Sequence, residues 1–171
     1  MILSKEQILE KKIVTEFLSP SQFQPAGVDF TVKEIHKLTS SGIIDFDNKK
    51  RKLSETKKLE FNDIGEIHLK KGCYKIIYNE YVSIPQDCIA LAFPRSSLLR
   101  CGADVHCAVW DPGYHGRSES LLVVENEFGI TLTKNAKVCQ LIFVRLETEA
   151  KDSYSGIYKG ENKGGLNENL H

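Results

Sequence analysis

The chain has 171 residues, which fits one domain with small appendages and is long enough to bury a hydrophobic core. Its 23 Lys and Arg residues equal its 23 Asp and Glu residues, so we expect no nucleic acid polymer and no membrane surface as a partner. No apolar run approaches the roughly 20 residues that span a bilayer, and charge interrupts the start of the chain, unlike a secretory signal. We therefore expect a cytoplasmic protein.

A short helix is expected near residues 4–11. Ser4 and Gln7 form the pattern of a capping box, in which each side chain bonds to a backbone N–H of the first turn. Ile8 and Leu9 then supply part of an apolar face. The pattern predicts a helix that packs on the main body of the protein.

Strand signals dominate the rest of the chain, where short runs rich in Val, Ile, Tyr and Phe alternate with turns. The predicted strands cover residues 26–32, 73–78, 81–84, 88–93, 105–110, 120–124, 130–132 and 138–146. Many short strands with frequent turns indicate an all-β barrel or sandwich.

Two segments lack strand signals. Residues 48–53 are basic and polar, and we interpret them as a solvated hairpin or loop tip, with a phosphate clamp as the alternative. The end of the chain is rich in Gly and Asn, so we expect one domain over residues 1–158 and a flexible tail over residues 159–171. The five cysteines are odd in number and lack a Cys-x-x-Cys spacing, which favours free thiols over a metal site.

Residues 94–100, Pro-Arg-Ser-Ser-Leu-Leu-Arg, follow an apolar strand and carry two arginines around two hydroxyls. The two leucines indicate one helical turn packed on the core, which would point Ser96, Ser97 and free backbone N–H groups outward as a phosphate seat. Arg95 and Arg100 would add charge-assisted hydrogen bonds. The alternative is a serine helix cap with two ordinary surface arginines.

Residues 109–117, Val-Trp-Asp-Pro-Gly-Tyr-His-Gly-Arg, contain the strongest turn signal. Pro112 and Gly113 fit the second and third positions of a type II turn, which places Asp111 and Tyr114 side by side at the mouth of a hairpin. A carboxylate there can accept a proton from water, and a tyrosine ring can pack against a sugar. The alternative is an Asx turn, in which Asp111 caps its own backbone.

Five segments in order carry a resemblance to a known family. They are residues 23–29 (Phe-Gln-Pro-Ala-Gly-Val-Asp), 94–100, 109–114, 136–143 (Ala-Lys-Val-Cys-Gln-Leu-Ile-Phe) and 154–162 (Tyr-Ser-Gly-Ile-Tyr-Lys-Gly-Glu-Asn). In this order they resemble the archaeal dUTPase branch of the dCTP deaminase/dUTPase superfamily. The resemblance implies a mainly β fold, a distorted jelly-roll-like β-barrel with a short N-terminal helix. It also implies a homotrimer with active sites at the subunit interfaces.

The resemblance further implies hydrolysis of dUTP to dUMP and pyrophosphate, with Mg²⁺ held by the triphosphate and waters and not directly by the protein. Asp111 would hold the water that attacks the α-phosphorus, and Tyr114 would pack on the deoxyribose and exclude a 2′-hydroxyl. Asp29 would orient an arginine or metal-bound water. The backbone of residues 105–110 would read uracil. The implied phosphate contacts are Arg95, Ser96, Ser97 and Arg100 from one subunit and Gln140 from another. The implied closing residues near the tail are Tyr154, Tyr158 and Glu161.

The first alternative is a dCTP deaminase or a bifunctional dCTP deaminase/dUTPase, since the superfamily holds both chemistries. In its deaminases a second carboxylate lies ten residues beyond the turn aspartate and three before an asparagine that ends the strand. In this sequence the residue ten beyond Asp111 is Leu121, and the residue three before Asn126 is Val123. Glu119 and Glu125 lie on either side of these positions, and their side chains would point to the same face of the strand. The sequence therefore favours attack on phosphorus.

A second alternative is an inactive nucleotide-binding trimer. The presence of Asp111 and of the complete segment 94–100 favours an enzyme over this alternative.

Overall fold

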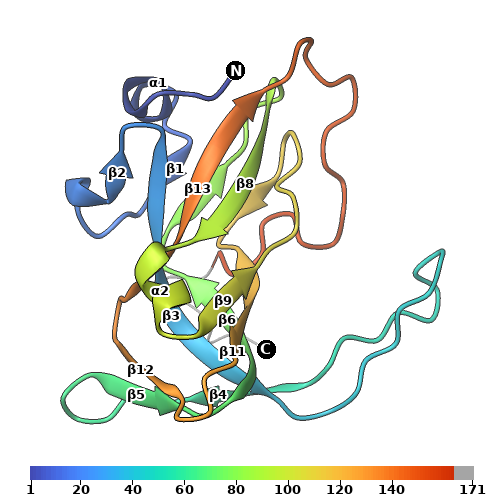
Figure 1. The fold of residues 1–171 in the computed structure, drawn as a ribbon. Coiled ribbons are helices and arrows are strands. Elements are labelled where there is room, and N and C mark those ends of the chain that lie inside the picture. The colour runs from blue at the N-terminus through green and yellow to red at the C-terminus, as the bar shows by residue number, and fades with distance from the viewer. Residues whose placement is uncertain (164–171) are drawn as a thin grey trace.

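The computed structural model describes residues 1–163, so the part of the predicted tail over residues 164–171 lies outside the described residues. The fold is mainly β, with strands wrapped into a barrel-like sheet (Figure 1). The helical elements are α1 (Lys5–Glu10), the 3-10 helix η1 (Pro20–Gln22) and α2 (Ser96–Arg100). The strands are β1 (Val14–Thr15), β2 (Phe23–Gln24), β3 (Gly27–Leu38), β4 (Thr56–Leu59), β5 (Glu66–Leu69), β6 (Gly72–Tyr78), β7 (Tyr81–Ser83), β8 (Cys88–Pro94), β9 (Ala103–His106), β10 (His115–Gly116), β11 (Glu119–Val124), β12 (Ile130–Thr133) and β13 (Lys137–Arg145).

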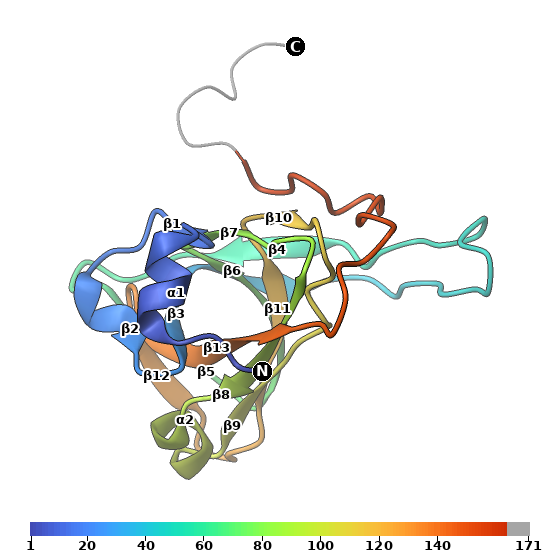
Figure 2. The ribbon, with the colours of Figure 1, turned by 90° about the horizontal axis from the view of Figure 1, so that it is seen from above.

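The main sheet runs in the order β8-β13-β3-β6-β11-β9, and every neighbouring pair is antiparallel. Its two edges meet through a bridge between Ala90 of β8 and Trp110, just beyond β9, with N–O distances of 3.0 and 3.1 Å. Seen from above in Figure 2, the strands therefore form a nearly closed ring around the core. The predicted barrel is confirmed.

The predicted N-terminal helix is also confirmed. Ser4 caps α1, and both hydrogen bonds of the capping box with Gln7 are present. Ile8 of α1 and the preceding Leu3 are fully buried, and α1 contacts β3, so the helix packs on the main body of the protein as predicted. Among residues 1–163, no helix is long and apolar enough to cross a membrane.

The predicted strand over residues 105–110 is wrong beyond His106, where β9 ends; each of the other predicted strands overlaps an observed one. The reason is the closure of the barrel. β9 pairs with β11 only as far as His106, and the chain then leaves β11 so that Trp110 reaches β8 on the opposite edge. All five cysteines are free, as expected, and two of them, Cys73 and Cys101, are exposed.

The basic segment 48–53 lies at the end of a long excursion between β3 and β4, which projects from the barrel in both ribbon views (Figures 1 and 2). A backbone bridge between Ile43 and Lys52 holds the two arms together, and Asn48 adopts φ 62° near the turn. Lys49 pairs with the neighbouring Asp47. These contacts support a solvated loop tip.

A buried carboxylate, Glu80, joins η1 to β3. Its two oxygens accept hydrogen bonds from the Gln22 amide (2.6 Å), the Thr31 hydroxyl (2.6 Å) and the Thr31 backbone N–H (2.9 Å). The Gln22 amide cannot turn around, because its oxygen accepts from the backbone N–H groups of Leu18 and Ser19. Burial raises the pKa of Glu80 above its usual value of 4.5.

Replacing Glu80 with Ala should lower the free energy of unfolding by about 3 kcal/mol, because buried donors lose their acceptor. The folded state holds the Glu80 proton to higher pH than the unfolded chain does, so the loss should be largest near pH 4.5 and should shrink as pH rises. Urea unfolding from pH 4.5 to 8 measures both effects, with the exposed Glu60→Ala as control. A loss that grows with pH would contradict this linkage.

Candidate active site

The turn over residues 111–114 has the geometry expected from its sequence. Gly113 adopts φ 77°, and the Tyr114 N–H donates to the Asp111 carbonyl at 3.1 Å. The Gly113 N–H donates instead to the Ile84 carbonyl at 3.1 Å, so it cannot serve an Asx turn. The Asp111 carboxylate is exposed and accepts no hydrogen bond from any other residue within 1–163. This leaves both carboxylate oxygens available to water.

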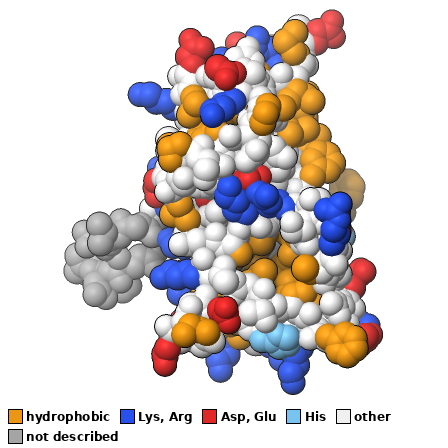
Figure 3. Space-filling model, turned by 60° about the vertical axis from the view of Figure 1, so that its left-hand side comes forward, with side chains coloured by type: hydrophobic (Ala, Val, Ile, Leu, Met, Phe, Trp, Pro, Cys, Tyr) orange, Lys and Arg blue, Asp and Glu red, His pale blue; other side chains and the backbone are white. Residues whose placement is uncertain are grey.

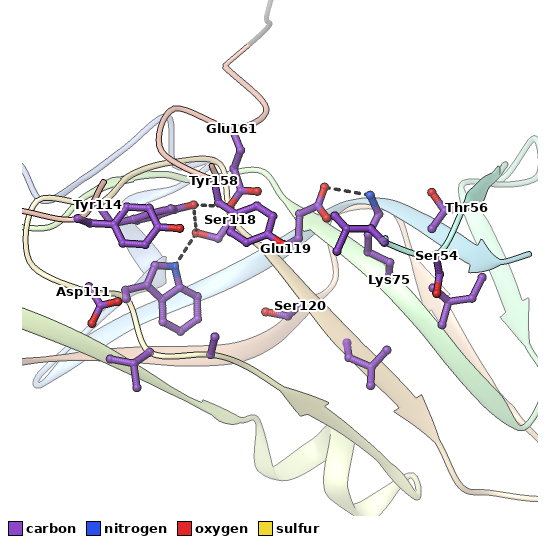
Figure 4. Close-up of a pocket in the computed structure, with 17 residues that line it drawn as sticks. Ser54, Thr56, Lys75, Asp111, Tyr114, Ser118, Glu119, Ser120, Tyr158 and Glu161 are labelled. Carbon is purple, nitrogen blue, oxygen red and sulfur yellow. Dashed lines mark hydrogen bonds and ion pairs between the residues drawn. The ribbon is translucent and has the colours of Figure 1, made fainter. Parts of the chain in front are cut away.

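Asp111 and Tyr114 line a cavity of about 570 Å³ on one side of the barrel (Figure 4). This volume suits a small-molecule ligand. Its walls come from the excursion, from β6 and β11, from residues 108–111 and from the C-terminal segment. The lining residues are Leu38, Leu53, Ser54, Thr56, Lys75, Ala108, Val109, Trp110, Asp111, Tyr114, Ser118, Glu119, Ser120, Leu121, Tyr154, Tyr158 and Glu161.

The C-terminal segment lies along residues 112–117 and covers this cavity. Three backbone hydrogen bonds hold it: Tyr154 N–H to the Pro112 carbonyl (2.8 Å), Gly160 N–H to the His115 carbonyl (2.7 Å), and Arg117 N–H to the Glu161 carbonyl (3.0 Å). The predicted closing residues Tyr154, Tyr158 and Glu161 therefore reach the cavity of their own chain.

Tyr114 is buried, and its ring meets the Tyr154 ring edge to face at 5.6 Å between centroids. Its hydroxyl donates to the Glu161 carboxylate at 2.7 Å. Burial raises the pKa of both Tyr114 and Glu161. The phenol thus remains a hydrogen-bond donor across the physiological pH range.

A second group of predicted residues lies around Asp29, which is buried on β3. One of its oxygens pairs with Arg95 and also accepts from Gln24 (3.0 Å) and Lys137 (3.3 Å). Gln140 lies opposite Asp29 in the β3–β13 register. Ser96, Ser97 and Arg100 are exposed on α2 beside this cluster. The result is a cluster of cations and hydroxyls with the chemistry to bind an anion, and we refer to these residues as the anion half-site.

The two groups do not meet within one chain. The cavity brings together Asp111, Tyr114, Tyr154, Tyr158 and Glu161, whereas none of the residues of the anion half-site lines it. Among the lining residues within 1–163, Lys75 is the one cation, and it pairs with Glu119 at 3.0 Å.

Several residues of both groups were not assigned to the site from the sequence. Glu119, which the sequence indicated only as a residue flanking the deaminase position, lines the cavity, and its carboxylate accepts from Lys75 and from the Asn162 amide (3.2 Å). Leu121 lines the cavity as well. The equal parity of positions 119 and 121 on one strand was the available signal. No signal in the sequence indicated Lys137, because it reaches Asp29 only through the pairing of β3 with β13.

The fold and the site together define a class: a mainly β barrel protein with a small-molecule cavity at its side and a separate anion half-site. A family model described as dCTP deaminase-like matches residues 3–146. The chain belongs to the dCTP deaminase-like family.

Archaeal relatives place the chain more closely. It is 49% identical over 162 residues to the probable deoxyuridine 5′-triphosphate nucleotidohydrolase of Methanosarcina mazei, covering 95% of this chain and 92% of that protein. It is 43% identical over 145 residues to the deoxyuridine 5′-triphosphate nucleotidohydrolase of Methanocaldococcus jannaschii, covering 84% and 90%. These relatives confirm the resemblance to the archaeal dUTPase branch.

A solved structure supports the fold alone. The 2′-deoxycytidine 5′-triphosphate deaminase from Agrobacterium tumefaciens superposes with a TM-score of 0.63 at 20% identity. The match covers 83% of this chain and 47% of that chain, so this chain spans just under half of the deaminase.

Replacing Gly113 with Ala should destabilise the protein by more than the roughly 1–2 kcal/mol that a left-handed non-glycine backbone costs. The added Cβ would overlap the Ser153 hydroxyl. Gly65→Ala is the matched control, because Gly65 has φ 75° and the nearest atom to its added Cβ is 3.9 Å away. Thermal unfolding compares the two variants; equal losses would show that the 150–154 loop is not packed on the turn.

Proposed function

We propose that this chain is a dUTP diphosphatase, which hydrolyses dUTP to dUMP and pyrophosphate. The observation that carries the proposal is the Asp111 carboxylate, exposed and without a hydrogen-bond partner in residues 1–163, at the edge of a cavity that also contains Tyr114. The names of the relatives at 43–49% identity support the same reaction.

In this mechanism the Asp111 carboxylate orients a water molecule and accepts its proton as the water oxygen attacks the α-phosphorus. A new P–O bond forms, the bond from the α-phosphorus to the bridging oxygen breaks, and pyrophosphate leaves with the electron pair. The proton then passes from Asp111 to solvent. The protein contributes mainly position and electrostatics, as in other phosphoryl-group reactions.

The anion half-site fits the triphosphate. Arg95 and Arg100 offset the charge that develops on the leaving pyrophosphate, while Ser96 and Ser97 bind phosphate oxygens. Gln140, predicted to act from a different subunit, lies opposite Asp29 in the same chain, and we propose that it binds phosphate from this half-site. Asp29 holds the Arg95 guanidinium in position through the ion pair between them.

The cavity fits the nucleoside. The Tyr114 ring packs on the deoxyribose, where a 2′-hydroxyl would collide with it. The backbone of residues 105–110, of which residues 108–110 line the cavity, reads uracil. Residues 159–171 form a tail that closes over the bound nucleotide, beyond a catalytic domain of residues 1–158.

A homotrimer with shared sites would unite the two groups. The outward face of β8 and β13 carries a row of partly exposed apolar side chains that leads to the anion half-site. Its members are Ile89, Leu91, Phe93, Ile142 and Val144. In Figure 3 hydrophobic side chains run along the right-hand edge of the molecule, beside a group of Lys and Arg side chains at mid-height. Burying such a row against a second copy is favourable and would bring Arg95 of one copy to the Asp111 cavity of another.

A divalent metal ion, Mg²⁺, would be held by the triphosphate. Residues 1–163 contain no group of three or more His, Cys, Asp or Glu side chains with metal-binding geometry. The unpartnered Asp111 carboxylate nevertheless suits the water ligands that Mg²⁺ retains, so the residues fit a substrate-held ion. When bound, the ion neutralises phosphate charge and favours departure of pyrophosphate.

Deamination of dCTP is the second candidate, because Glu119 gives the cavity a second carboxylate. Two observations favour hydrolysis. The Glu119 Oε1 atom accepts from Lys75 and Asn162, and the two positions expected for a deaminase carboxylate are Leu121 and Val123, neither of which is acidic. Ammonia released from dCTP would establish deamination, whereas pyrophosphate released from dUTP establishes hydrolysis.

Replacing Asp111 with Asn should lower kcat for dUTP by about 10²- to 10⁴-fold while the affinity for dUTP stays within a small factor, because the amide keeps the shape but cannot accept the water proton. Pyrophosphate release and calorimetric binding measure the two effects. The exposed Asp63→Asn serves as the control. Near-normal turnover by Asp111→Asn would remove Asp111 from the mechanism.

Mixing two inactive variants tests the shared site. Arg95→Ala and Asp111→Asn should each be inactive alone, yet mixed trimers re-formed at equal ratio should recover about a quarter of wild-type activity, since one interface in four unites two intact halves. Light scattering confirms assembly. No recovery from assembled trimers, or a fully active monomer, would contradict a site built from two copies.

A further inference from the structure

Tyr114 lies in a continuous line of hydrogen bonds that starts at Trp110 and ends on the C-terminal segment. The indole N–H of Trp110 donates to the Ser118 hydroxyl at 2.6 Å, and the Ser118 and Tyr114 hydroxyls are 3.2 Å apart. The Tyr114 hydroxyl donates to the Glu161 carboxylate at 2.7 Å. Figure 4 shows Ser118 between the indole and the Tyr114 ring.

The direction of each bond in this line is fixed by chemistry. An indole can only donate and an ionised carboxylate can only accept. The Tyr114 proton therefore points to Glu161. Because this is the only proton on the Tyr114 hydroxyl, the bond between the two hydroxyls must be donated by Ser118 to the Tyr114 oxygen. Each of the two hydroxyls thus accepts one bond and donates one.

The environment makes every bond of this line costly to lose. Trp110, Tyr114 and Ser118 are 5%, 6% and 2% exposed, so water cannot easily replace a missing partner. The neighbouring residue is shaped for the same contact: a Cβ on Gly116 would lie 2.9 Å from the Tyr114 hydroxyl and 3.3 Å from the Glu161 backbone nitrogen. A side chain at position 116 would force the Tyr114 hydroxyl and Glu161 to move.

We propose that Ser118 and Glu161 are positioning residues that hold the Tyr114 ring, and that selection of 2′-deoxyribose over ribose depends on docking of the C-terminal segment. Ser118 fixes the ring from the barrel side. Glu161 fixes it from the other side only while residues 160–162 lie on residues 115–117. Sugar selection is thereby coupled to closure of the cavity. The proposal rests on the proposed function in assigning the sugar contact to Tyr114.

The test measures kcat and KM for dUTP and UTP, and calorimetric Kd values for dUMP and UMP. Ser118→Ala and Glu161→Ala should each raise the UTP-to-dUTP ratio of kcat/KM by about three- to tenfold, the effect of one buried hydrogen bond. Tyr114→Phe loses both of these bonds and should raise the ratio by at least as much. The Ser118→Ala/Tyr114→Phe double variant should show no more than the larger single effect, because both act through one line. Glu161→Gln should keep most of the wild-type ratio, since its amide oxygen still accepts.

Two controls separate a positioning role from general damage. Ser41→Ala, at an exposed serine of the excursion, should leave the ratio unchanged. Trp110 is the single tryptophan of the chain, so a change of its fluorescence in Ser118→Ala, with an unchanged thermal midpoint, reports loss of the first bond in a folded protein.

The outcomes are distinct. A Ser118→Ala variant with the wild-type sugar ratio, or additive effects in the double variant, would overturn the proposal while dUTP hydrolysis stands. Absence of pyrophosphate release by the wild-type protein would overturn the proposed function. The dUMP and UMP affinities of the variants would still test whether the hydrogen bonds from Ser118 and Glu161 hold Tyr114 for sugar selection. Equal wild-type affinities for dUMP and UMP would refute the sugar-selecting role of Tyr114 itself.

Discussion

The backbone bridge between Ala90 and Trp110 is the contact on which both the barrel and the site depend. It joins the two edges of the main sheet, and the next residue in the chain is Asp111. At the other end of the turn, the Gly113 N–H donates to the carbonyl of Ile84, which directly follows β7. The turn is therefore fixed at both ends by backbone bonds. Asp111 is placed by the closure of the barrel and needs no side-chain hydrogen bond of its own, which leaves its carboxylate free for chemistry.

Local signals in the sequence predicted the parts of this arrangement that local physics decides. The capping box of α1, the Pro112-Gly113 turn and the helical turn of α2 all form where their residues indicate. Contacts between distant segments had no such signal. Lys75 meets Glu119 across the β6–β11 pair, and residues 107–110 abandon their strand because the barrel must close. Both depend on sheet register, which the alternation of one strand does not determine.

The same limit explains why the predicted site residues separate into two groups. The sequence places Arg95 and Asp111 only 16 positions apart, yet α2 and β9 carry the chain to another part of the barrel between them. Arg95 then turns to the buried Asp29, and Asp111 faces the cavity. A barrel with a packed core cannot bend to bring the two together. In the proposed function, a second copy of the chain places the anion half-site against the cavity. The cavity needs such cations because Lys75, which lines it, is already paired with Glu119.

Because the proposed site is divided into two groups, sugar selection in it depends on the C-terminal segment, which holds Tyr114 through Glu161. In the proposed function, the cations and hydroxyls of the anion half-site bind phosphate, which is common to ribonucleotides and deoxyribonucleotides, so they would not select the sugar. Selection must come from the cavity, and within it from a ring that cannot shift by the width of a hydroxyl group. Tyr114 meets that requirement only while its hydroxyl has both partners, one in the barrel and one on the segment. A nucleotide that keeps the C-terminal segment from docking would leave the buried Tyr114 hydroxyl without its acceptor, Glu161. The free-energy cost of that unpaired group would lower the affinity for this nucleotide.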